Sequence, residues 1–543
     1  MSNLYPGNRP QITKTIFFTI LLILPACLAM SLSYSQGMKE IDVLQYNIDI
    51  EINDTTNEIK GNAAIEVLIT DTETSVTLDL ASINNENKGM VVDSIFMNGT
   101  KTDFVHEDNL LRLPVPEIDS TTITNINVFY HGIPADGLII SPNKHGQRTF
   151  FASNWPDQAH HWFPCNDHPA DRATVNFTIT APSHYQVIAT GLLSKKINMP
   201  GKKTSHYWSS SVQIPTKSMT FAAAEFAVFY PGYIDSIPYS NWVYPQSMEE
   251  GFNDFSVTPD ILRFFSDMLG QYPFEKVANV QSTANQRGTE NAGTIYYDEK
   301  SVTGDHTIKY TIVQELANQW FGSSVTESDW PHLWLSKGIA TWLTGWYIEQ
   351  NNGGEELIDR LILQREKIID FTNEKLVPVV DHHPADYTEL LNPNIYQKGS
   401  WILHMLRRDI GEKKLIETLV EFYEQFELSS ASTNDFMKIL ENVSGQEMEQ
   451  FFDDWLYSAG HPVLDVSTSF KNGRLNMELL QTQQHKMAFT FPLDIRFVFE
   501  DGKMQDHTFD IIFRRHEFII DMPSEPVEII LDPDVWLLFE QKK

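Results

Sequence analysis

The chain has 543 residues, of which 42% are hydrophobic and 12% aromatic, a composition that supports several packed cores and argues against a disordered chain. Asp and Glu outnumber Lys and Arg by 72 to 40, which gives a net charge of −32. This balance argues against nucleic acid or an anionic membrane surface as a partner, because phosphate groups are bound by clustered cations. The ordinary consequence of such acidity is solubility.

The first 35 residues have the pattern of a targeting segment. Arg9 and Lys14 precede an apolar run over 16–32, and small residues follow it. This order is typical of a signal peptide cleaved near Gln36, so we expect an exported protein, periplasmic or extracellular. Two alternatives remain open: the run is retained as a short membrane anchor, or Cys27 carries a lipid. Contact with a membrane is expected only in those two cases.

Between about residues 42 and 233, short runs alternate apolar and polar side chains, with turn signals between them. The runs 46–52 and 64–69 are examples. A period of two residues is typical of half-buried strands. We therefore predict an N-terminal antiparallel β domain over 39–240.

From about residue 245 the apolar residues recur with the 3.6-residue period of helices. Ser336 is expected to precede and cap one of these helices. Strands return after Gly460, as in 488–493 and 518–521, which predicts a small β-sandwich over 462–543. The helical domain is expected over 245–460, with helices at 258–271, 307–321, 337–351, 355–372, 396–409, 412–428, 432–443 and 446–459.

Polar residues at fixed spacings occupy the helical region. Gln314, Glu315 and Asn318 fall within one expected helix, and Lys337 falls at the start of the next. Residues 287–291 read Arg-Gly-Thr-Glu-Asn, and residues 396–399 read Tyr-Gln-Lys-Gly.

In the order and spacing of these segments the chain resembles the M1 family of zinc aminopeptidases, the membrane alanyl aminopeptidase-like gluzincins, throughout its mature region. That family carries G-x-M-E-N, H-E-x-x-H, a Glu and a catalytic Tyr, and eighteen residues separate the Glu from H-E-x-x-H, as they separate Lys337 from Asn318 here. The stretches 162–169 and 452–462 match the family as well. The resemblance implies a multidomain α+β fold with an N-terminal antiparallel β saddle domain, a thermolysin-like, mainly helical catalytic-type domain and a C-terminal β-sandwich.

The resemblance also implies roles for individual residues. Glu315 corresponds to the general base, and Tyr396 to the tyrosine that stabilises the tetrahedral oxyanion. Glu290 corresponds to the carboxylate that holds a substrate's free α-amino group, with Gly288 and Asn291 beside it as further substrate-binding positions. The Gly and Met of the family's G-x-M-E-N are replaced, so the backbone contacts of that motif are in doubt.

The three metal-ligand positions depart from the family. Two histidines four residues apart on a helix present their nitrogens to Zn²⁺ from one face, but Gln314 and Asn318 occupy these positions, and Lys337 stands in place of the third ligand, a Glu. Carboxamides are weak zinc ligands, and a protonated amine has no free lone pair. We therefore expect no metal and no cofactor, with the family's zinc as the alternative. His332 lies nearby in the sequence and is the candidate for a substitute zinc ligand.

Without a metal, bound water keeps a pKa near that of bulk water, and Glu315 alone is a poor activator of it. The family site has a net charge of +1 from the ion and its Glu ligand, and Lys337 supplies the same charge by itself. We predict that Lys337 occupies the vacated metal position and pairs with Glu315, while Gln314 and Asn318 donate hydrogen bonds to the neighbouring carboxylates.

Three functions are compatible with the resemblance to family M1 and the replaced ligand positions. The first is a catalytically impaired, zinc-free homologue, a pseudoenzyme that binds peptides or protein N-termini through Glu290. The second is an active metallo-aminopeptidase that releases N-terminal residues through a different metal arrangement. The third is a structural partner that modulates an active paralogue. All three share one fold, so the fold alone does not choose among them.

Overall fold

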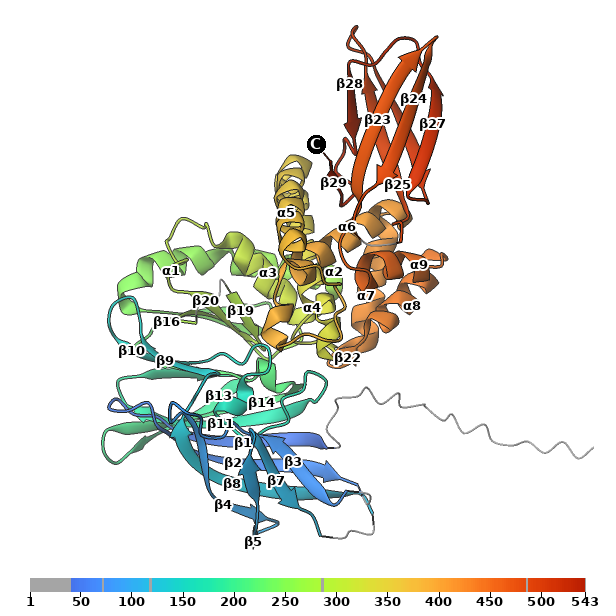
Figure 1. The fold of residues 1–543 in the computed structure, drawn as a ribbon. Coiled ribbons are helices and arrows are strands. Elements are labelled where there is room, and N and C mark those ends of the chain that lie inside the picture. Colours follow the sequence, from blue (N-terminus) through green and yellow to red (C-terminus); the bar gives the residue numbers. More distant parts are fainter. Residues whose placement is uncertain (1–40, 71–72, 117–119, 285–287, 485–486, 543) are drawn as a thin grey trace, which may run out of the picture. The chain divides into compact units, whose positions relative to one another are not determined.

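The computed structural model describes residues 41–542, apart from 71–72, 117–119, 285–287 and 485–486 (Figure 1). The segment predicted as a signal peptide, residues 1–35, lies outside the described residues. Within the described part, no helix is both long enough and apolar enough to cross a bilayer.

An eight-stranded, largely antiparallel sheet forms the N-terminal region (Figure 1). Its strands alternate buried and partly exposed side chains, as the two-residue period predicted. The one parallel neighbour pair among the described strands of this sheet joins β1 to β11. In spatial order the strands are β13 (Leu192–Met199), β14 (Lys203–Ile214), β11 (Ala173–Pro182), β1 (Asp42–Glu51), β2 (Ile59–Ile69), β8 (Thr122–Ile133), β4 (Gly89–Met97) and β5 (Thr100–Thr102).

Two smaller sheets accompany it in the N-terminal region. One contains β3 (Ser75–Asp79), β7 (Leu110–Pro114) and β6 (Val105–Glu107). The other contains β12 (Gln186–Ala189), β15 (Phe221–Ala224), β10 (Arg148–Ala152) and β9 (Leu138–Pro142). All of β15 and nearly all of β10 are buried, and the chain leaves β10 towards Trp155, which lies at the site described below.

A five-stranded mixed sheet leads into the helical region. Its strands are, in spatial order, β16 (Ala227–Ile234), β17 (Ile237–Val243), β18 (Val277–Ser282), β20 (Thr294–Asp298) and β19 (Gly288–Asn291). β18 is parallel to both of its neighbours, and β19 is antiparallel to β20 at the edge. The periodicity predicted no strand between 271 and 307, because β18 is buried along its whole length and so shows no alternation.

The predicted helices are confirmed, with ends that differ by a few residues. They are α2 (Thr258–Leu269), α3 (Lys309–Trp320), α4 (Trp334–Asn352), α5 (Gly354–Glu374), α6 (Gly399–Ile410), α7 (Glu412–Phe426), α8 (Thr433–Ser444) and α9 (Glu449–Phe452), and a short α1 (Met248–Asp254) precedes them. α4 packs against α3, α5 and α6.

One detail of the helix prediction was wrong, and another is confirmed only in part. Ser336 does not precede its helix: α4 begins at Trp334, and the Ser336 hydroxyl donates to Glu327 Oε2 at 2.8 Å. The helix predicted over 446–459 is an α-helical turn followed by a π-helical turn, Asp453–Tyr457. Ser336, which was predicted to lie before the helix, is buried in the first turn of α4, beside the site.

Two sheets, antiparallel except for the short strand β29, make the C-terminal β-sandwich. The first contains β27 (Arg515–Asp521), β24 (Arg474–Gln481), β23 (Val463–Lys471) and the short parallel β29 (Glu540–Gln541). The second contains β26 (Met504–Ile511), β25 (Phe491–Val498) and β28 (Glu528–Leu531). Alternate apolar side chains of β24 and β25 are buried in the core between them. The predicted fold class is confirmed.

Candidate functional site

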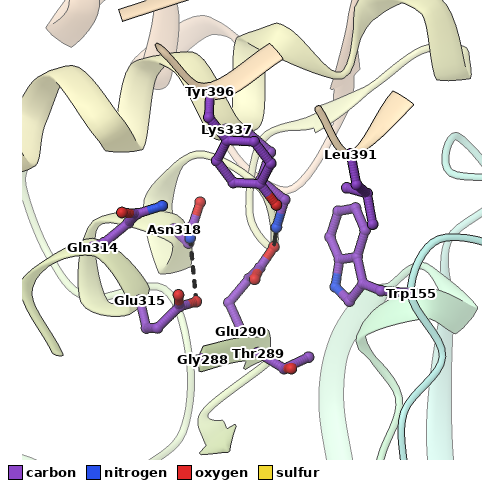
Figure 2. Close-up of a pocket in the computed structure, with 10 residues that line it drawn as sticks. All are labelled: Trp155, Gly288, Thr289, Glu290, Gln314, Glu315, Asn318, Lys337, Leu391 and Tyr396. Carbon is purple, nitrogen blue, oxygen red and sulfur yellow. Dashed lines mark hydrogen bonds and ion pairs between the residues drawn. The ribbon is translucent and has the colours of Figure 1, made fainter. Parts of the chain in front are cut away.

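α3 brings three of the predicted site residues to one cavity (Figure 2). Gln314 and Asn318 are four residues apart, so both side chains lie on the same face of the helix, one turn apart. Glu315 follows Gln314, and its Oε2 accepts a hydrogen bond of 3.2 Å from Asn318 Nδ2. In the resembled family this face of the helix carries metal ligands. Here it carries the carboxamide side chains of Gln314 and Asn318.

β19 supplies the opposite wall of the cavity. Gly288 and Glu290 are two residues apart and therefore lie on one face of the strand. Gly288 leaves room for the acid on α3, because a Cβ at this position would lie only 2.6 Å from Glu315 Cγ. Asn291, which was predicted as a substrate-binding residue, is buried but does not line the cavity.

Lys337, in the first turn of α4, reaches across the cavity to β19. Its ammonium forms an ion pair with Glu290 Oε1, and the two side chains are only 6% and 2% exposed (Figure 2). The ammonium also lies 3.9 Å from the centre of the Trp155 ring and 6.0 Å from that of Tyr396, within the range of cation–π attraction. The lysine is therefore enclosed by one carboxylate and two aromatic rings.

The predicted ion pair between Lys337 and Glu315 was wrong, since the partner of Lys337 is Glu290. The geometry of β19 gives the reason. Glu315 packs over Gly288 and is held there by Asn318, whereas Glu290 projects farther along the same strand face towards α4. The prediction that Asn318 donates a hydrogen bond to a neighbouring carboxyl group is confirmed.

Burial and neighbouring charges set the protonation of the three central groups. Burial, and after it the charge of Glu290, hold the pKa of Glu315 well above its ordinary value, while Lys337 and Asn318 act in the opposite direction. Burial alone would lower the pKa of Lys337, but Glu290, Tyr396 and Glu315 together raise it above its ordinary value. Burial raises the pKa of Tyr396 to about 12. Burial and neighbouring charge thus favour the neutral forms of Glu315 and Tyr396 beside the Lys337–Glu290 ion pair.

A second buried ion pair flanks the first. Lys217, from the N-terminal region, pairs with Glu327, and both side chains are almost completely buried. The Lys217 ammonium lies 4.1 Å from the centre of the Trp155 ring, so two ammonium groups contact the same indole. Each of these two lysines has its own carboxylate, which leaves Glu315 as the acid at this site without a cation of its own.

The space that remains in the cavity is about 20 Å³, room for a single water molecule. The predicted residues that line it are Gly288, Glu290, Gln314, Glu315, Asn318, Lys337 and Tyr396, together with Trp155, Thr289 and Leu391. The last three were not predicted. No local pattern marks Trp155 or Leu391, because they reach the cavity from distant parts of the chain.

Tyr396 lies in a π-helical turn, Asn394–Lys398, immediately before α6. Two glycines bring this turn close to α4: a Cβ on Gly338 would lie 3.0 Å from the Cα of Gly399 and 3.2 Å from the Ile395 carbonyl oxygen. The close crossing places the Tyr396 ring beside the Lys337 ammonium. The spacing of Tyr396 from α4 is therefore fixed by backbone contact and not by side-chain packing alone.

The residues at the three ligand positions do not fit a zinc ion. Lys337 holds its ammonium on Glu290, and Gln314 and Asn318 offer only carboxamides. Asn318 Oδ1 is buried without a hydrogen-bond partner among the described residues, but one carboxamide oxygen is not a zinc ligand set. No group of three or more His, Cys, Asp or Glu side chains in the described ranges could hold a metal ion.

His332 does not replace a missing ligand. It lies outside the residues that line the cavity, and its Nδ1 lies 2.9 Å from Thr433 Oγ1. Burial lowers its pKa, so the imidazole is neutral at physiological pH. This histidine joins the 3-10 turn before α4, Trp330–His332, to the start of α8 and is not part of the site.

The N-terminal β region and the helical region each match a known protein family. The Peptidase M1 N-terminal domain matches residues 43–217, and the Peptidase family M1 domain matches residues 254–455. The chain belongs to peptidase family M1.

Relatives support this assignment at low identity. Aminopeptidase M1-C of Oryza sativa subsp. japonica is 27% identical over 324 residues, which are 56% of this chain and 36% of that protein. The mitochondrial aminopeptidase 2 of Saccharomyces cerevisiae is 25% identical over 471 residues, 80% of this chain and 48% of that protein. The chain thus spans between about a third and a half of the length of these curated relatives.

A solved structure of similar fold is that of Legionella pneumophila aminopeptidase A in complex with aspartic acid. It superposes with a TM-score of 0.79 at 16% identity, over 94% of this chain and 60% of that one. At this identity the likeness concerns the fold, which agrees with the predicted three-domain arrangement.

Proposed function

We propose that this chain is a zinc-free member of family M1 that binds peptide amino termini without hydrolysing them. The observation that carries the proposal is the Lys337–Glu290 ion pair, which puts an ammonium where the family needs a metal ligand. Gln314 and Asn318 supply no replacement for the lost donors. Hydrolysis by the family's mechanism then lacks the group that lowers the pKa of the attacking water.

The proton balance of the cavity supports the absence of hydrolysis. A general base must be ionised at the working pH, but burial and the charge of Glu290 favour the protonated form of Glu315. A protonated Glu315 donates a hydrogen bond and does not take a proton from water. Tyr396 keeps its phenolic proton and remains able to donate to a carbonyl oxygen of a bound peptide.

Glu290 is the proposed anchor for the amino terminus of a peptide. Its carboxylate already binds one ammonium, that of Lys337, beside the face of Trp155. A peptide α-ammonium has the same charge and the same hydrogen-bond donors, so it can replace the lysine ammonium on Glu290. Titration calorimetry with a short peptide and with its N-acetylated form tests this step.

We expect the free peptide to bind more tightly than the acetylated one, because only a free α-ammonium can replace the Lys337 ammonium on Glu290. Mass spectrometry after the titration is expected to recover the peptide intact. Equal affinities for both forms would show that Glu290 is not the anchor. Shortening of the peptide from its amino terminus would support the alternative, an active metallo-aminopeptidase.

We also propose that the protein is exported. The support is the basic and apolar pattern of residues 1–35. Amino-terminal sequencing of the protein from its native host is expected to begin near Gln36, and a mature chain that begins at the initiator methionine and stays inside the cell would contradict export.

A further inference from the structure

The cavity has the features of a site for a primary ammonium. Glu290 supplies a buried carboxylate, the Trp155 ring faces the cation at 3.9 Å, and the Tyr396 ring lies at 6.0 Å. A carboxylate combined with aromatic faces is an arrangement that binds alkylammonium groups through charge, hydrogen bonds and cation–π attraction. In the structure, this site is occupied by the ammonium group of Lys337.

The lysine leaves little room for a ligand that carries a second ammonium on a carbon chain. About 20 Å³ of free space remains, and the Lys337 side chain is only 6% exposed. A ligand amine must therefore displace the lysine ammonium before it reaches Glu290.

The backbone of Lys337 is held in place by hydrogen bonds, while its side-chain ammonium competes with ligand amines for Glu290. Its N–H donates to the Leu333 carbonyl at 3.1 Å, and its own carbonyl accepts from Thr341 Oγ1 at 2.7 Å. An ammonium tethered in this way stays next to Glu290 at a local concentration above that of any dissolved peptide. The wild-type site is consequently closed to weak amine ligands.

We infer that Lys337 is a built-in competitor that occupies the ammonium site of its own pocket, so that the strength of the Lys337–Glu290 pair limits which amino-terminal ligands enter. The identity of the natural ligand rests on the function proposed above, whereas self-occupation of the site rests on the geometry alone. Ligands that gain further contacts outside the ammonium site displace the lysine, and isolated small amines do not.

Substitution of Lys337 by alanine tests the inference with a matched small molecule. Lys337→Ala removes three methylene groups and the ammonium, and n-propylammonium has the same composition. We expect n-propylammonium to raise the melting temperature of Lys337→Ala in a saturable manner, by roughly 2 °C or more, and to leave the wild-type protein unchanged. Propan-1-ol and sodium chloride at equal concentration serve as controls for the apolar chain and for ionic strength.

The double variant Glu290→Gln/Lys337→Ala is expected to lose the response, because the carboxylate that binds the ammonium is gone. A folded Lys337→Ala that does not respond to n-propylammonium would overturn the inference, as would an equal response of the wild-type protein.

Lys337→Gln provides a second measurement in case the alanine variant does not fold. It keeps a hydrogen-bond donor towards Glu290 and is expected to bind a free-amine peptide at least tenfold more tightly than the wild type, with no gain for the acetylated peptide. Equal affinity of Lys337→Gln and wild type for the free peptide would also overturn it.

The two proposals fail in different ways. If Lys337→Ala responds to n-propylammonium but no form of the protein binds peptides, self-occupation stands and the peptide function falls. If the wild-type protein binds peptides through a free amine and Lys337→Ala does not respond to n-propylammonium, the peptide function stands and self-occupation falls.

Discussion

At the scale of single residues, the site is governed by the balance of buried charge. Burying an unpaired ion costs several kcal/mol, and this cost is avoided when each cation has a carboxylate. Lys217 pairs with Glu327, and Lys337 pairs with Glu290. Glu315 has no cation of its own, and burial beside the charge of Glu290 favours its neutral form.

This arrangement predicts the behaviour of Glu315→Gln. The folded pKa of Glu315 lies above its ordinary value of 4.5, so between these two values the folded chain holds a proton that the unfolded chain has released. Its contribution to stability is therefore full below about pH 4.5 and declines as the pH rises towards the folded pKa. Glutamine keeps one acceptor for Asn318 and one donor, as the protonated acid does, but it cannot ionise.

We expect Glu315→Gln to change the free energy of unfolding by less than about 1 kcal/mol at pH 5, and to be the more stable protein at pH 8. Urea denaturation at both pH values measures the difference. A variant that is less stable than the wild type at pH 8 would show that Glu315 is an ionised group in the folded protein. Glu249→Gln, an exposed acid at the start of α1, is the control that should leave the pH dependence unchanged.

At the scale of elements, a close crossing between α4 and α6 sets the distance between Lys337 and Tyr396. Gly338 and Gly399 contact each other directly, and a Cβ on either would lie 3.0 Å from the Cα of the other, so a backbone would have to shift. Gly345, two turns later on α4, offers a matched comparison, because a Cβ there would meet only the Leu357 side chain, at 3.1 Å.

Gly338→Ala is expected to destabilise the protein by about 1–3 kcal/mol, since the new methyl group forces two backbones apart. Gly345→Ala is expected to cost little, or to stabilise by up to about 1 kcal/mol, because Leu357 can move and alanine favours the helix. Thermal or urea unfolding of both variants gives the comparison. A Gly338→Ala variant as stable as Gly345→Ala would contradict the account of the crossing.

The helices and the β-sandwich could be predicted from the sequence because their apolar residues repeat with a clear period. β18 could not, since it is buried on both faces and shows no alternation. The residues of the site could be predicted by position, but the partner of Lys337 could not. That choice depends on how Glu315 packs over Gly288, a contact between an edge strand and a helix that no spacing in the sequence encodes. Trp155 was missed for a similar reason, since it approaches from the N-terminal region.

At the scale of the whole molecule, the cavity depends on parts of the chain that are far apart in sequence. Trp155 and Lys217 come from the N-terminal region, and Glu290, Lys337 and Tyr396 come from the region that matches the Peptidase family M1 domain. Domains that match family M1 thus surround a site that, in the proposed function, lacks the donors of the metal. Restoring those donors is expected to restore the metal.

The triple variant Gln314→His/Asn318→His/Lys337→Glu is expected to bind about one zinc ion per chain after dialysis, because all three donors then converge on one position. Each single variant is expected to retain only background zinc, since two weak or absent ligands remain in each case. Metal analysis of the four proteins by atomic emission measures this. Tight zinc in any single variant would mean that the remaining wild-type residues already contribute ligands.

The most direct measurement concerns the wild-type protein itself. Zinc content after purification and aminoacyl-anilide hydrolysis are measured together, with and without added Zn²⁺ and with a chelator. The account predicts no retained zinc and no turnover above the rate without protein, in every condition. Near-stoichiometric zinc, together with turnover that the chelator abolishes, would contradict it and establish an active metallo-aminopeptidase.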